Sequence, residues 1–280
     1  MARGGDEGSR GTALRAAGRV LAGLRAPGGV EITLRRVYPS HTGLGSGTQI
    51  ALAVARGIGE LFGQDLPVPE LARLTGRGGT SGIGTAAFER GGFIIDGGHA
   101  FGAGAEKDGF RPSSASPGVR PAPVIARHDF PAGWRIVLAT PRLPAGASGG
   151  REAEIFRKAC PVPLEEVRET CHEVLMRMLP GVVDQDLDLF GRAVNRIQQL
   201  GFKRVEIGLQ PPGIPLLMEE LRAAGAACAG MSSFGPTVYA VTDTNAPGIL
   251  RSATGFLEEH GGGEAWVSAP RNTGARARVC

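Results

Sequence analysis

The chain has 280 residues, of which 42% are hydrophobic and 21% are charged, and this composition excludes disorder over the full length. The 31 basic and 27 acidic residues give a formal net charge of +4, and aromatic residues make up only 5%, so we expect no nucleic-acid partner. The 45 glycines follow no three-residue repeat, which excludes a collagen-like chain.

The start of the chain predicts a loose segment followed by a helix, a strand and a second helix. Residues 1 to about 11 are rich in glycine and charge, and we expect them to be loose. Apolar residues at helical spacing predict an amphipathic helix over 12–24, and apolar–polar alternation predicts a strand over 30–34. Ile50, Val54, Ile58 and Leu61 share one face of the next predicted helix.

The rest of the chain mixes helices with short strands, which predicts an α+β fold with two layers in each domain. We expect one domain over 1–130 and a second over 131–280, with a loop at 102–123 and a disordered Arg-rich tail after Pro270. Helices are predicted at 69–74, 152–159, 163–178, 184–200, 214–224 and 246–260, and strands at 93–95, 134–139, 204–208, 226–229, 237–242 and 264–267.

The first glycine-rich motif lies between a predicted strand and a predicted helix. It contains Gly43, Gly45, Ser46, Gly47 and Thr48. Glycines let backbone N–H groups converge, and a helix N-terminus adds a partial positive charge, so the motif predicts a phosphate site. It is not the common nucleotide loop, because no lysine follows Gly47. The alternative is a tight turn in which Ser46 or Thr48 caps the helix.

A second glycine-rich stretch, 76–85, also predicts a ligand cradle. Gly79, Thr80 and Ser81 offer backbone and hydroxyl groups, and the guanidinium of Arg77 suits a carboxylate or a phosphate. The alternative is an ordinary loop with Arg77 facing solvent.

Two further motifs complete the candidate site. Asp96 ends a strand before two glycines, where it could bind Mg²⁺ or face a developing cation, with turn capping as the alternative. His99 follows as a ligand candidate, and the loop 230–235 brings Ser232 and Ser233 between two strands, where they could close over the same ligand.

The four cysteines and the chain start indicate a cytoplasmic protein. No two cysteines form a C-x-x-C pair, so we expect reduced thiols, and the N-terminus has no apolar signal region. The longest apolar stretch, 50–58, is interrupted by Arg56, so no membrane association is expected.

The motifs resemble those of a known superfamily. The string H-T-G-L-G-S-G-T-Q resembles the phosphate loop of the GHMP kinase superfamily, and G-M-S-S-F-G-P resembles its C-terminal glycine motif. The longer string G-R-G-G-T-S-G-I-G-T-A-A-F-E-R-G-G-F-I-I-D-G-G-H is similar to the β-ribofuranosylaminobenzene 5′-phosphate synthases, a non-kinase family of that superfamily. The resemblance runs from about residue 12 to residue 268.

The resemblance implies a two-domain GHMP-kinase-like fold, with a ferredoxin-like α/β sandwich as its second domain. It implies a pentosyltransferase that joins phosphoribosyl diphosphate to 4-aminobenzoate or 4-hydroxybenzoate, releases CO₂ and diphosphate, and serves methanopterin biosynthesis with Mg²⁺ as cofactor. In that reaction Asp96 would face the cation or hold the metal, and Arg77 would position the carboxylate. A homodimer is compatible with the resemblance.

Two rival interpretations stay open at this point. The same phosphate loop would suit an ATP-dependent small-molecule kinase. Members of the superfamily usually begin with strands ahead of the helix predicted at 12–24, and this sequence lacks them. We therefore expect an exposed strand edge at 30–37, and an N-terminally truncated, inactive fragment is the second rival.

Overall fold

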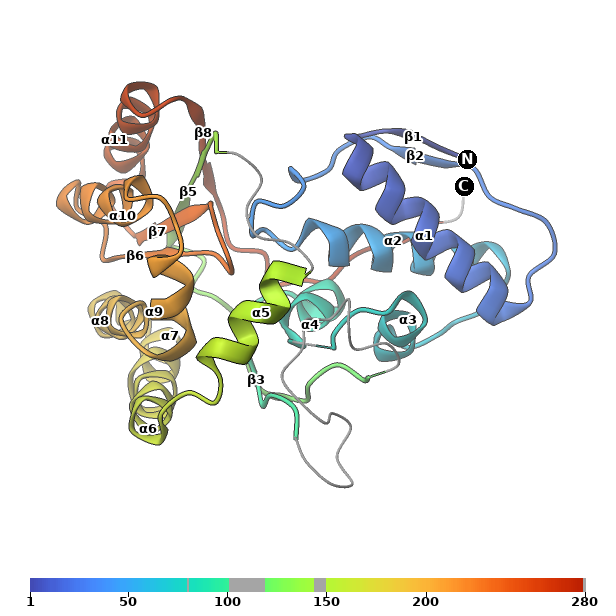
Figure 1. Cartoon of the computed structure of the whole chain (residues 1–280), viewed down its shortest axis with the longest axis horizontal. Coiled ribbons are helices and arrows are strands. Elements are labelled where there is room, and N and C mark those ends of the chain that lie inside the picture. The colour runs from blue at the N-terminus through green and yellow to red at the C-terminus, as the bar shows by residue number, and fades with distance from the viewer. Residues whose placement is uncertain (80, 101–118, 144–149, 279–280) are drawn as a thin grey trace.

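The computed structural model describes residues 1–79, 81–100, 119–143 and 150–278, which form two lobes side by side (Figure 1). The elements up to β4 form the N-terminal lobe, and most elements from β5 onward form the C-terminal lobe. In chain order they are β1 (Ala2–Gly4), α1 (Glu7–Leu24), β2 (Ile32–Leu34), α2 (Ser46–Leu61), α3 (Val68–Thr75), α4 (Ile83–Arg90), β3 (Phe93–Asp96), β4 (Val124–His128), β5 (Arg135–Pro141), α5 (Gly150–Ala159), α6 (Leu164–Glu173), a π-helical turn (Val174–Met178), α7 (Leu179–Val183), α8 (Leu187–Ile197), α9 (Gly201–Gly208), α10 (Gly213–Ala223), β6 (Cys228–Met231), β7 (Val238–Thr242), α11 (Ala246–Glu259) and β8 (Gly263–Ser268).

Small side chains hold the helices of the N-terminal lobe together. Ala13, Ala16 and Ala17 on α1 are buried in one hydrophobic cluster with residues of α2 and α3. The predicted apolar face of α2 is buried except at its end, where Leu61 is 66% exposed. This packing joins α1, α2 and α3 in one body.

The first residues are ordered, and the expectation of a loose segment over 1–11 is wrong. β1 pairs in parallel with β2, with Ala2 opposite Ile32, and the terminal amine of Met1 donates to the carbonyl of Val30 at 3.0 Å. The carboxylate of Asp6 accepts from the N–H of Ser9 at 2.7 Å and caps α1, which therefore begins at Glu7. Composition alone indicated a loose segment because strand pairing depends on a distant partner.

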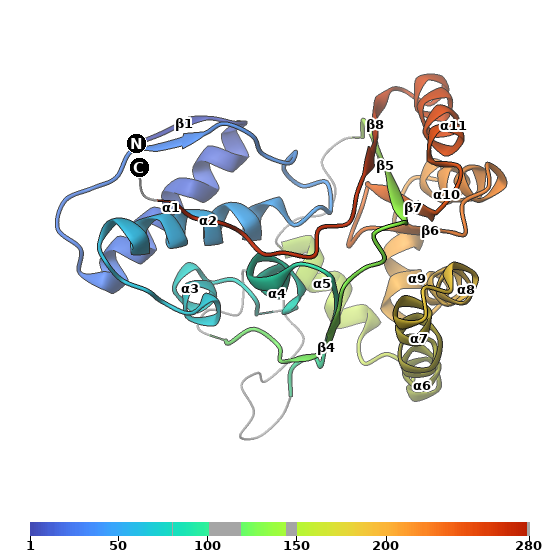
Figure 2. The ribbon, with the colours of Figure 1, turned by 180° about the vertical axis from the view of Figure 1, so that it is seen from behind.

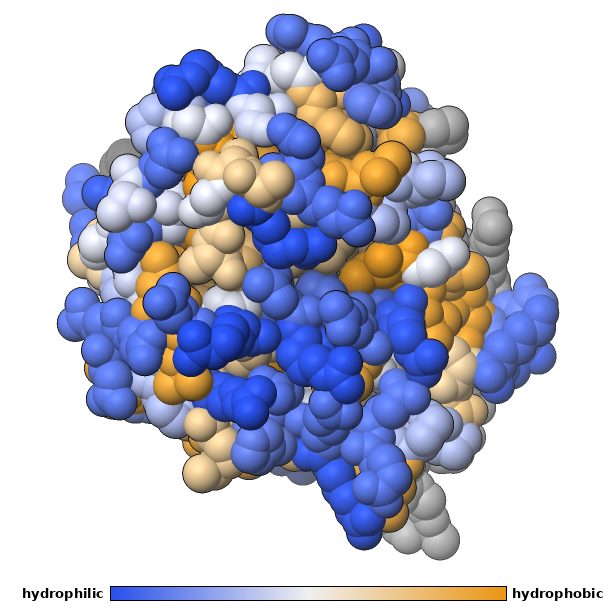
Figure 3. All heavy atoms as spheres, turned by 90° about the vertical axis from the view of Figure 1, so that its left-hand side faces the viewer, coloured by the Kyte–Doolittle hydropathy of each residue, from blue (hydrophilic) through white to orange (hydrophobic). Residues whose placement is uncertain are grey.

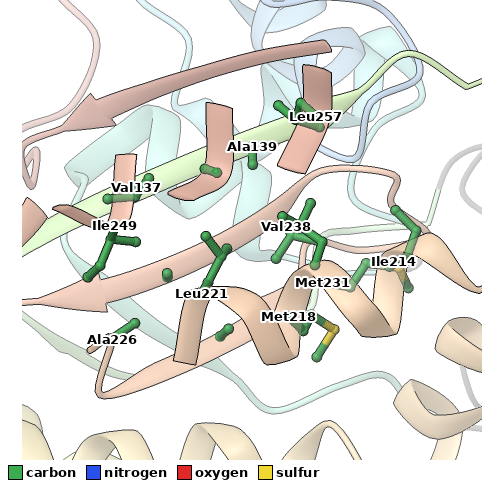
Figure 4. Close-up of a cluster of buried hydrophobic side chains, with 14 of the residues drawn as sticks. Val137, Ala139, Ile214, Met218, Leu221, Ala226, Met231, Val238, Ile249 and Leu257 are labelled. Atoms are coloured by element: carbon green, nitrogen blue, oxygen red, sulfur yellow. The ribbon is translucent and has the colours of Figure 1, made fainter. Parts of the chain in front are cut away.

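The C-terminal lobe is a four-stranded antiparallel sheet in the order β6-β7-β5-β8. With α10 and α11 this is the βαββαβ arrangement of ferredoxin-like domains, as expected. Figure 4 shows the buried cluster between these two helices and the sheet, which includes Val137, Leu221 and Ile249. Because α8 packs on β6 through the opposite face, the strands are apolar on both sides. The outer side of the lobe is mostly hydrophilic with small apolar patches (Figure 3).

An aromatic cluster connects the two lobes. Phe93 of β3 and Phe130, which follows β4, pack against Trp134 and Phe190. The ring centroids of Phe130 and Trp134 lie 5.2 Å apart in an edge-to-face arrangement, and those of Phe93 and Phe190 lie 6.1 Å apart.

Residues 204–208, expected to be a strand, belong to the helix α9. The alternation of Val205 and Ile207 is too short to establish a strand. Lys203 and Glu206 form an ion pair at the i, i+3 spacing of a helix. This spacing of opposite charges indicates a helix more strongly than the short apolar alternation indicates a strand.

The tail after Pro270 is ordered up to residue 278 and crosses to the N-terminal lobe (Figure 2). The side chain of Asn272 accepts from the N–H of Phe130 at 2.8 Å and donates to its carbonyl at 3.0 Å. The N–H of Ala275 donates to the carbonyl of Phe88 at 2.7 Å. The expected disordered tail is therefore wrong over these residues.

Helix α4 and strand β4 were not predicted as elements.

Among the described residues no helix is long and apolar enough to cross a membrane. The described cysteines, Cys160, Cys171 and Cys228, are free thiols.

Candidate functional site

The first glycine motif forms an open turn at the N-terminus of α2. Gly43 and Gly45 have φ angles of 84° and 70°, the left-handed region that glycine adopts without penalty. Gly45 is the N-cap, so the N–H groups of Ser46 and Gly47 have no acceptor within the helix. A Cβ atom at Gly45 would meet nothing within 4 Å, so the space beside Gly45 is open. An anion can sit there.

A loop of the C-terminal lobe closes on this turn. The hydroxyl of Ser232 donates to the carbonyl of Gly43 at 2.9 Å, and the N–H of Thr237 donates to the carbonyl of Thr42 at 3.3 Å. A Cβ at Gly43 would lie 2.2 Å from the carbonyl oxygen of Ser232, so glycine is required for this approach. The first and the fourth glycine motifs of the sequence therefore meet.

Helix α9 holds the closing loop from behind. The ammonium of Lys203 donates to the carbonyl of Ser233 at 2.9 Å, and the side-chain amide of Gln210, just after the helix, donates to that of Phe234 at 2.9 Å. Ser233 itself has a φ of 50°. Sequence reasoning missed Lys203 because it treated the neighbouring residues as a strand.

Asp96 organises the N-terminus of α4. Its Oδ2 accepts from the hydroxyl of Ser81 and from the N–H of Gly82, both at 2.8 Å, and its Oδ1 accepts from the N–H of Gly98 at 3.1 Å. Gly82 is the N-cap of α4, so the carboxylate lies at the positive end of that helix. These hydrogen bonds are those expected if Asp96 caps a turn, which was the alternative interpretation of this residue. The catalytic role of Asp96 stays a prediction.

The N-terminal turns of α2 and α4 are in contact. The side-chain amide of Gln49 donates to the carbonyl of Gly84 at 2.8 Å, and a Cβ at Gly84 would lie 3.1 Å from the methyl group of Thr48. The first turns of two helices, each with free N–H groups, are therefore neighbours.

Arg77 lies on another side of the first turn of α2. A Cβ at Gly47 would be 3.4 Å from both terminal nitrogens of its guanidinium. The pKa of Arg77 is lowered, first by burial and then by the charges of Arg15 and Arg19 on α1. No carboxylate of a described residue forms an ion pair with it. The alternative, an Arg77 that faces solvent, does not fit this half-buried position.

The structure also describes Gly79 and His99 of the predicted site. Gly79 is buried close to Arg77 in the sequence, and the ring of His99 forms a 2.8 Å hydrogen bond with the carbonyl of Arg120. Thr80 lies outside the described residues. Asp96 contacts the start of α4, and α4 contacts the first turn of α2. Arg77 lies beside that turn, and Ser232 bonds to Gly43 just before it.

The fit of Mg²⁺ depends on Asp96. Within the described ranges no three acidic, histidine or cysteine side chains gather as a metal cage. Mg²⁺ is commonly held by one or two carboxylates together with substrate phosphates. A carboxylate has about four lone-pair positions, and three of those on Asp96 accept hydrogen bonds. Asp96 therefore fits as one ligand of a metal that arrives with a diphosphate.

An apolar cleft of about 330 Å³ begins beside α4. Its volume is within the range of small-molecule sites. It is lined by Ile83, Ala87, Gly92, Phe93, Ile94, Phe130, Ile136, Pro270 and Arg271. Ile83 is the first residue of α4, so one end of the cleft adjoins the turn that Asp96 holds.

Comparisons with known proteins agree with this geometry. Residues 11–92 match the family described as GHMP kinases N terminal domain, and residues 178–257 match GHMP kinases C terminal. The homoserine kinase from Cytophaga hutchinsonii has the same fold, with a TM-score of 0.67 at 20% identity over 94% of this chain and 77% of that one.

Two curated archaeal relatives are much more similar in sequence. The protein from Archaeoglobus fulgidus is 51% identical over 252 residues, which are 90% of this chain and 77% of the relative. The protein from Methanocaldococcus jannaschii is 47% identical over 247 residues, 88% of this chain and 73% of the relative. Both are named β-ribofuranosylphenol 5′-phosphate synthase.

Proposed function

We propose, because this chain belongs to the β-ribofuranosylphenol 5′-phosphate synthase family of GHMP-fold enzymes, that it joins phosphoribosyl diphosphate to a para-substituted benzoate. The bond between ribosyl C1 and the diphosphate breaks, and C1 bonds to the ring carbon that carries the carboxylate. CO₂ leaves that carbon, and its bonding electrons restore the aromatic ring. The products are a C-riboside 5′-phosphate for a methanopterin-type carrier, CO₂ and diphosphate.

The identity to the two archaeal relatives, over about nine-tenths of this chain, is the observation that carries the proposal. Their name gives a ribofuranosylphenol as the product, and replacing the carboxylate of 4-hydroxybenzoate by a ribosyl group leaves a phenol. We therefore favour 4-hydroxybenzoate over 4-aminobenzoate as the acceptor.

The backbone of the glycine turn suits the departure of diphosphate. The N–H groups of Ser46 and Gly47 and the N-terminus of α4 supply fixed positive ends of dipoles on two neighbouring helix turns. Donors that are already oriented stabilise the charge that develops on a leaving group without reorganising. Mg²⁺, held by Asp96 and the diphosphate, would neutralise further charge on that group.

The carboxylate of Asp96 would also stabilise positive charge that develops on the ribosyl ring. Its three hydrogen bonds fix its position, so no reorganisation is needed when the charge appears.

The apolar cleft suits the benzoate ring. Phe93 and Phe130 line it, and its end at Ile83 adjoins the N-terminus of α4. An aromatic ring in such a cleft loses contact with water, which would otherwise attack the ribosyl centre. The closing loop at Ser232 would exclude water from the other side of the glycine turn.

The test is a comparison of substrates on the purified chain. With phosphoribosyl diphosphate, Mg²⁺ and carboxyl-labelled 4-hydroxybenzoate, we expect labelled CO₂ in equal amount to diphosphate. Parallel reactions contain 4-aminobenzoate, no ribosyl donor, or ATP with a small alcohol. ATP consumption without CO₂ release would favour the kinase rival, and a folded chain that is inactive in every reaction would favour the fragment rival.

A further inference from the structure

Three arginine side chains from two helical segments gather beside the first turn of α2. Arg15 and Arg19 lie on α1, and Arg77 follows α3. Arg15 donates to the hydroxyl of Thr12 at 3.1 Å, and Arg19 donates to the carbonyl of Thr75 at 2.8 Å. None of the three forms an ion pair with a carboxylate in the part of the chain that the structure describes.

This arrangement is unfavourable without an anion. Arg77 is half-buried, and a Cβ at Gly76, next to it in the chain, would lie 2.4 Å from a terminal nitrogen of the exposed Arg19. Burial first, and then the charges of Arg19 and the exposed Arg15, lower the pKa of Arg77. Burial and like charge both disfavour the charged form. Arginine, however, stays protonated in proteins. A ligand with two negative charges would relieve the repulsion.

The first turn of α2 has two different neighbours. On one side Gly47 faces the guanidinium of Arg77. On the other side Thr48 touches Gly84 of α4, whose N-terminal turn is held by the carboxylate of Asp96. A metal-bound anion suits the carboxylate side, and a metal-free anion suits the side with three cations.

We propose that Arg15, Arg19 and Arg77 bind the 5′-phosphate of the ribosyl substrate, apart from the diphosphate at the α4 side of the turn. The assignment rests on the proposed function, which supplies a substrate with two separate phosphate groups. The 5′-phosphate stays on the sugar throughout the reaction, so permanent charges can hold it, whereas the diphosphate must leave.

The benzoate carboxylate is a poorer occupant of this arginine cluster. It carries one negative charge, and a phosphate monoester carries nearly two at neutral pH. It must also be lost as CO₂, and a tight contact with three cations would stabilise it before the transition state.

Calorimetric titrations with ribose 5-phosphate and with Mg²⁺–diphosphate test the assignment. We expect the two probes to bind together, one saturating without displacing the other. Arg15→Gln and Arg77→Gln should each weaken ribose 5-phosphate binding by about 10-fold or more, the scale of one charge-assisted hydrogen bond. Their affinity for Mg²⁺–diphosphate should change less than about threefold, and Asp96→Asn should show the reverse pattern.

Arg25→Gln is the matched control. Arg25 is exposed at the end of α1, six residues or about 9 Å along the helix from Arg19. Its replacement should leave both affinities unchanged, and near-UV circular dichroism will verify that each variant is folded.

Three results would overturn the assignment: no binding of ribose 5-phosphate to the parent chain, displacement of one probe by the other, or loss of 4-hydroxybenzoate binding in Arg77→Gln with ribose 5-phosphate binding intact. Turnover is not the readout. A chain that binds both probes as expected but forms no C-riboside would refute the proposed reaction and leave the phosphate site in place.

Discussion

The hydroxyl of Ser232 donates a 2.9 Å hydrogen bond to the carbonyl of Gly43, 189 residues earlier in the chain. The contact joins the closing loop of the C-terminal lobe to the glycine turn of the N-terminal lobe. Gly43 has a φ of 84° and no room for a Cβ on the side of Ser232. The shape of the anion site therefore depends on both lobes.

We predict that Gly43→Ala is more harmful than Gly28→Ala. Both glycines have a left-handed φ, which costs alanine about 1–2 kcal/mol. At Gly28 a Cβ meets nothing within 4 Å, but at Gly43 it would lie 2.2 Å from a backbone oxygen. Urea unfolding should show a loss of about 1–2 kcal/mol for Gly28→Ala and a larger loss for Gly43→Ala, with turnover reduced at least 10-fold only in the latter. Equal losses of stability and turnover in the two variants would mean that the closing loop moves away from the new Cβ at position 43 without a free-energy cost.

Local patterns predicted much of this site because each motif contains its own elements. The turn at Gly43 and Gly45, the helix that follows, and the strand that ends at Asp96 are all defined within a few residues. The motifs also carried the family resemblance. Their convergence was predicted only through that resemblance, since no local pattern relates Gly43 to Ser232.

Contacts with distant partners explain what the sequence did not predict. β1 is a strand because Ala2 pairs with Ile32, and the tail is ordered because Asn272 bonds to Phe130. Lys203 supports the closing loop by bonding to carbonyl oxygens, a contact that depends on the fold and not on a sequence pattern. The same is true of Arg15 and Arg19, which look like the ordinary charged face of an amphipathic helix.

Asn272→Ala should release the tail from the N-terminal lobe. The side chain makes two hydrogen bonds to the backbone of Phe130, and each is worth about 1 kcal/mol. We expect a loss of about 1–3 kcal/mol in urea unfolding and faster amide exchange at Ala275. The neighbour Thr273 is exposed, so Thr273→Ala is the control and should change neither quantity. An unaffected Asn272→Ala variant would show that the tail contributes nothing to stability.

Asp96→Asn separates a role in catalysis from a role in loop order. An amide keeps one acceptor oxygen but loses the negative charge and an acceptor for Ser81 or Gly98. We expect turnover to fall about 100-fold, the scale for one electrostatic stabiliser. Ser81→Ala removes a hydrogen bond from the same carboxylate without removing its charge, and we expect a turnover loss of less than about 10-fold. If the two variants lost similar amounts of turnover, the role of Asp96 would be to order the loop and not to take part in catalysis.

Glu206 should make the chain less stable as pH rises above about 4.5. Burial raises its pKa, and the nearby ammonium of Lys203 only partly opposes this shift. Between 4.5, the ordinary pKa of a glutamate, and the higher pKa in the folded state, the folded state binds more protons than the unfolded state, so stability falls with rising pH in this window. Glu206→Gln should remove this fall. We would measure urea unfolding of both proteins from pH 4 to pH 8, and parallel curves would contradict the prediction.

Arg77→Met should make the ligand-free protein more stable. The folded state lowers the pKa of Arg77, so its charged form, present at every working pH, is destabilised by folding. A neutral side chain of similar length removes that penalty and keeps the apolar packing of the stem. Arg73, four residues earlier, is the control, because its pKa shifts in the opposite direction. It pairs with Glu70, which raises the pKa of Arg73. Thermal unfolding without ligand should therefore give a higher midpoint for Arg77→Met and an unchanged or lower midpoint for Arg73→Met. Ribose 5-phosphate should raise the midpoint of the parent and of Arg73→Met, but hardly that of Arg77→Met. If Arg77→Met unfolded at a lower temperature than Arg73→Met, the guanidinium would be a structural support, and the charge repulsion on which the phosphate site depends would be absent.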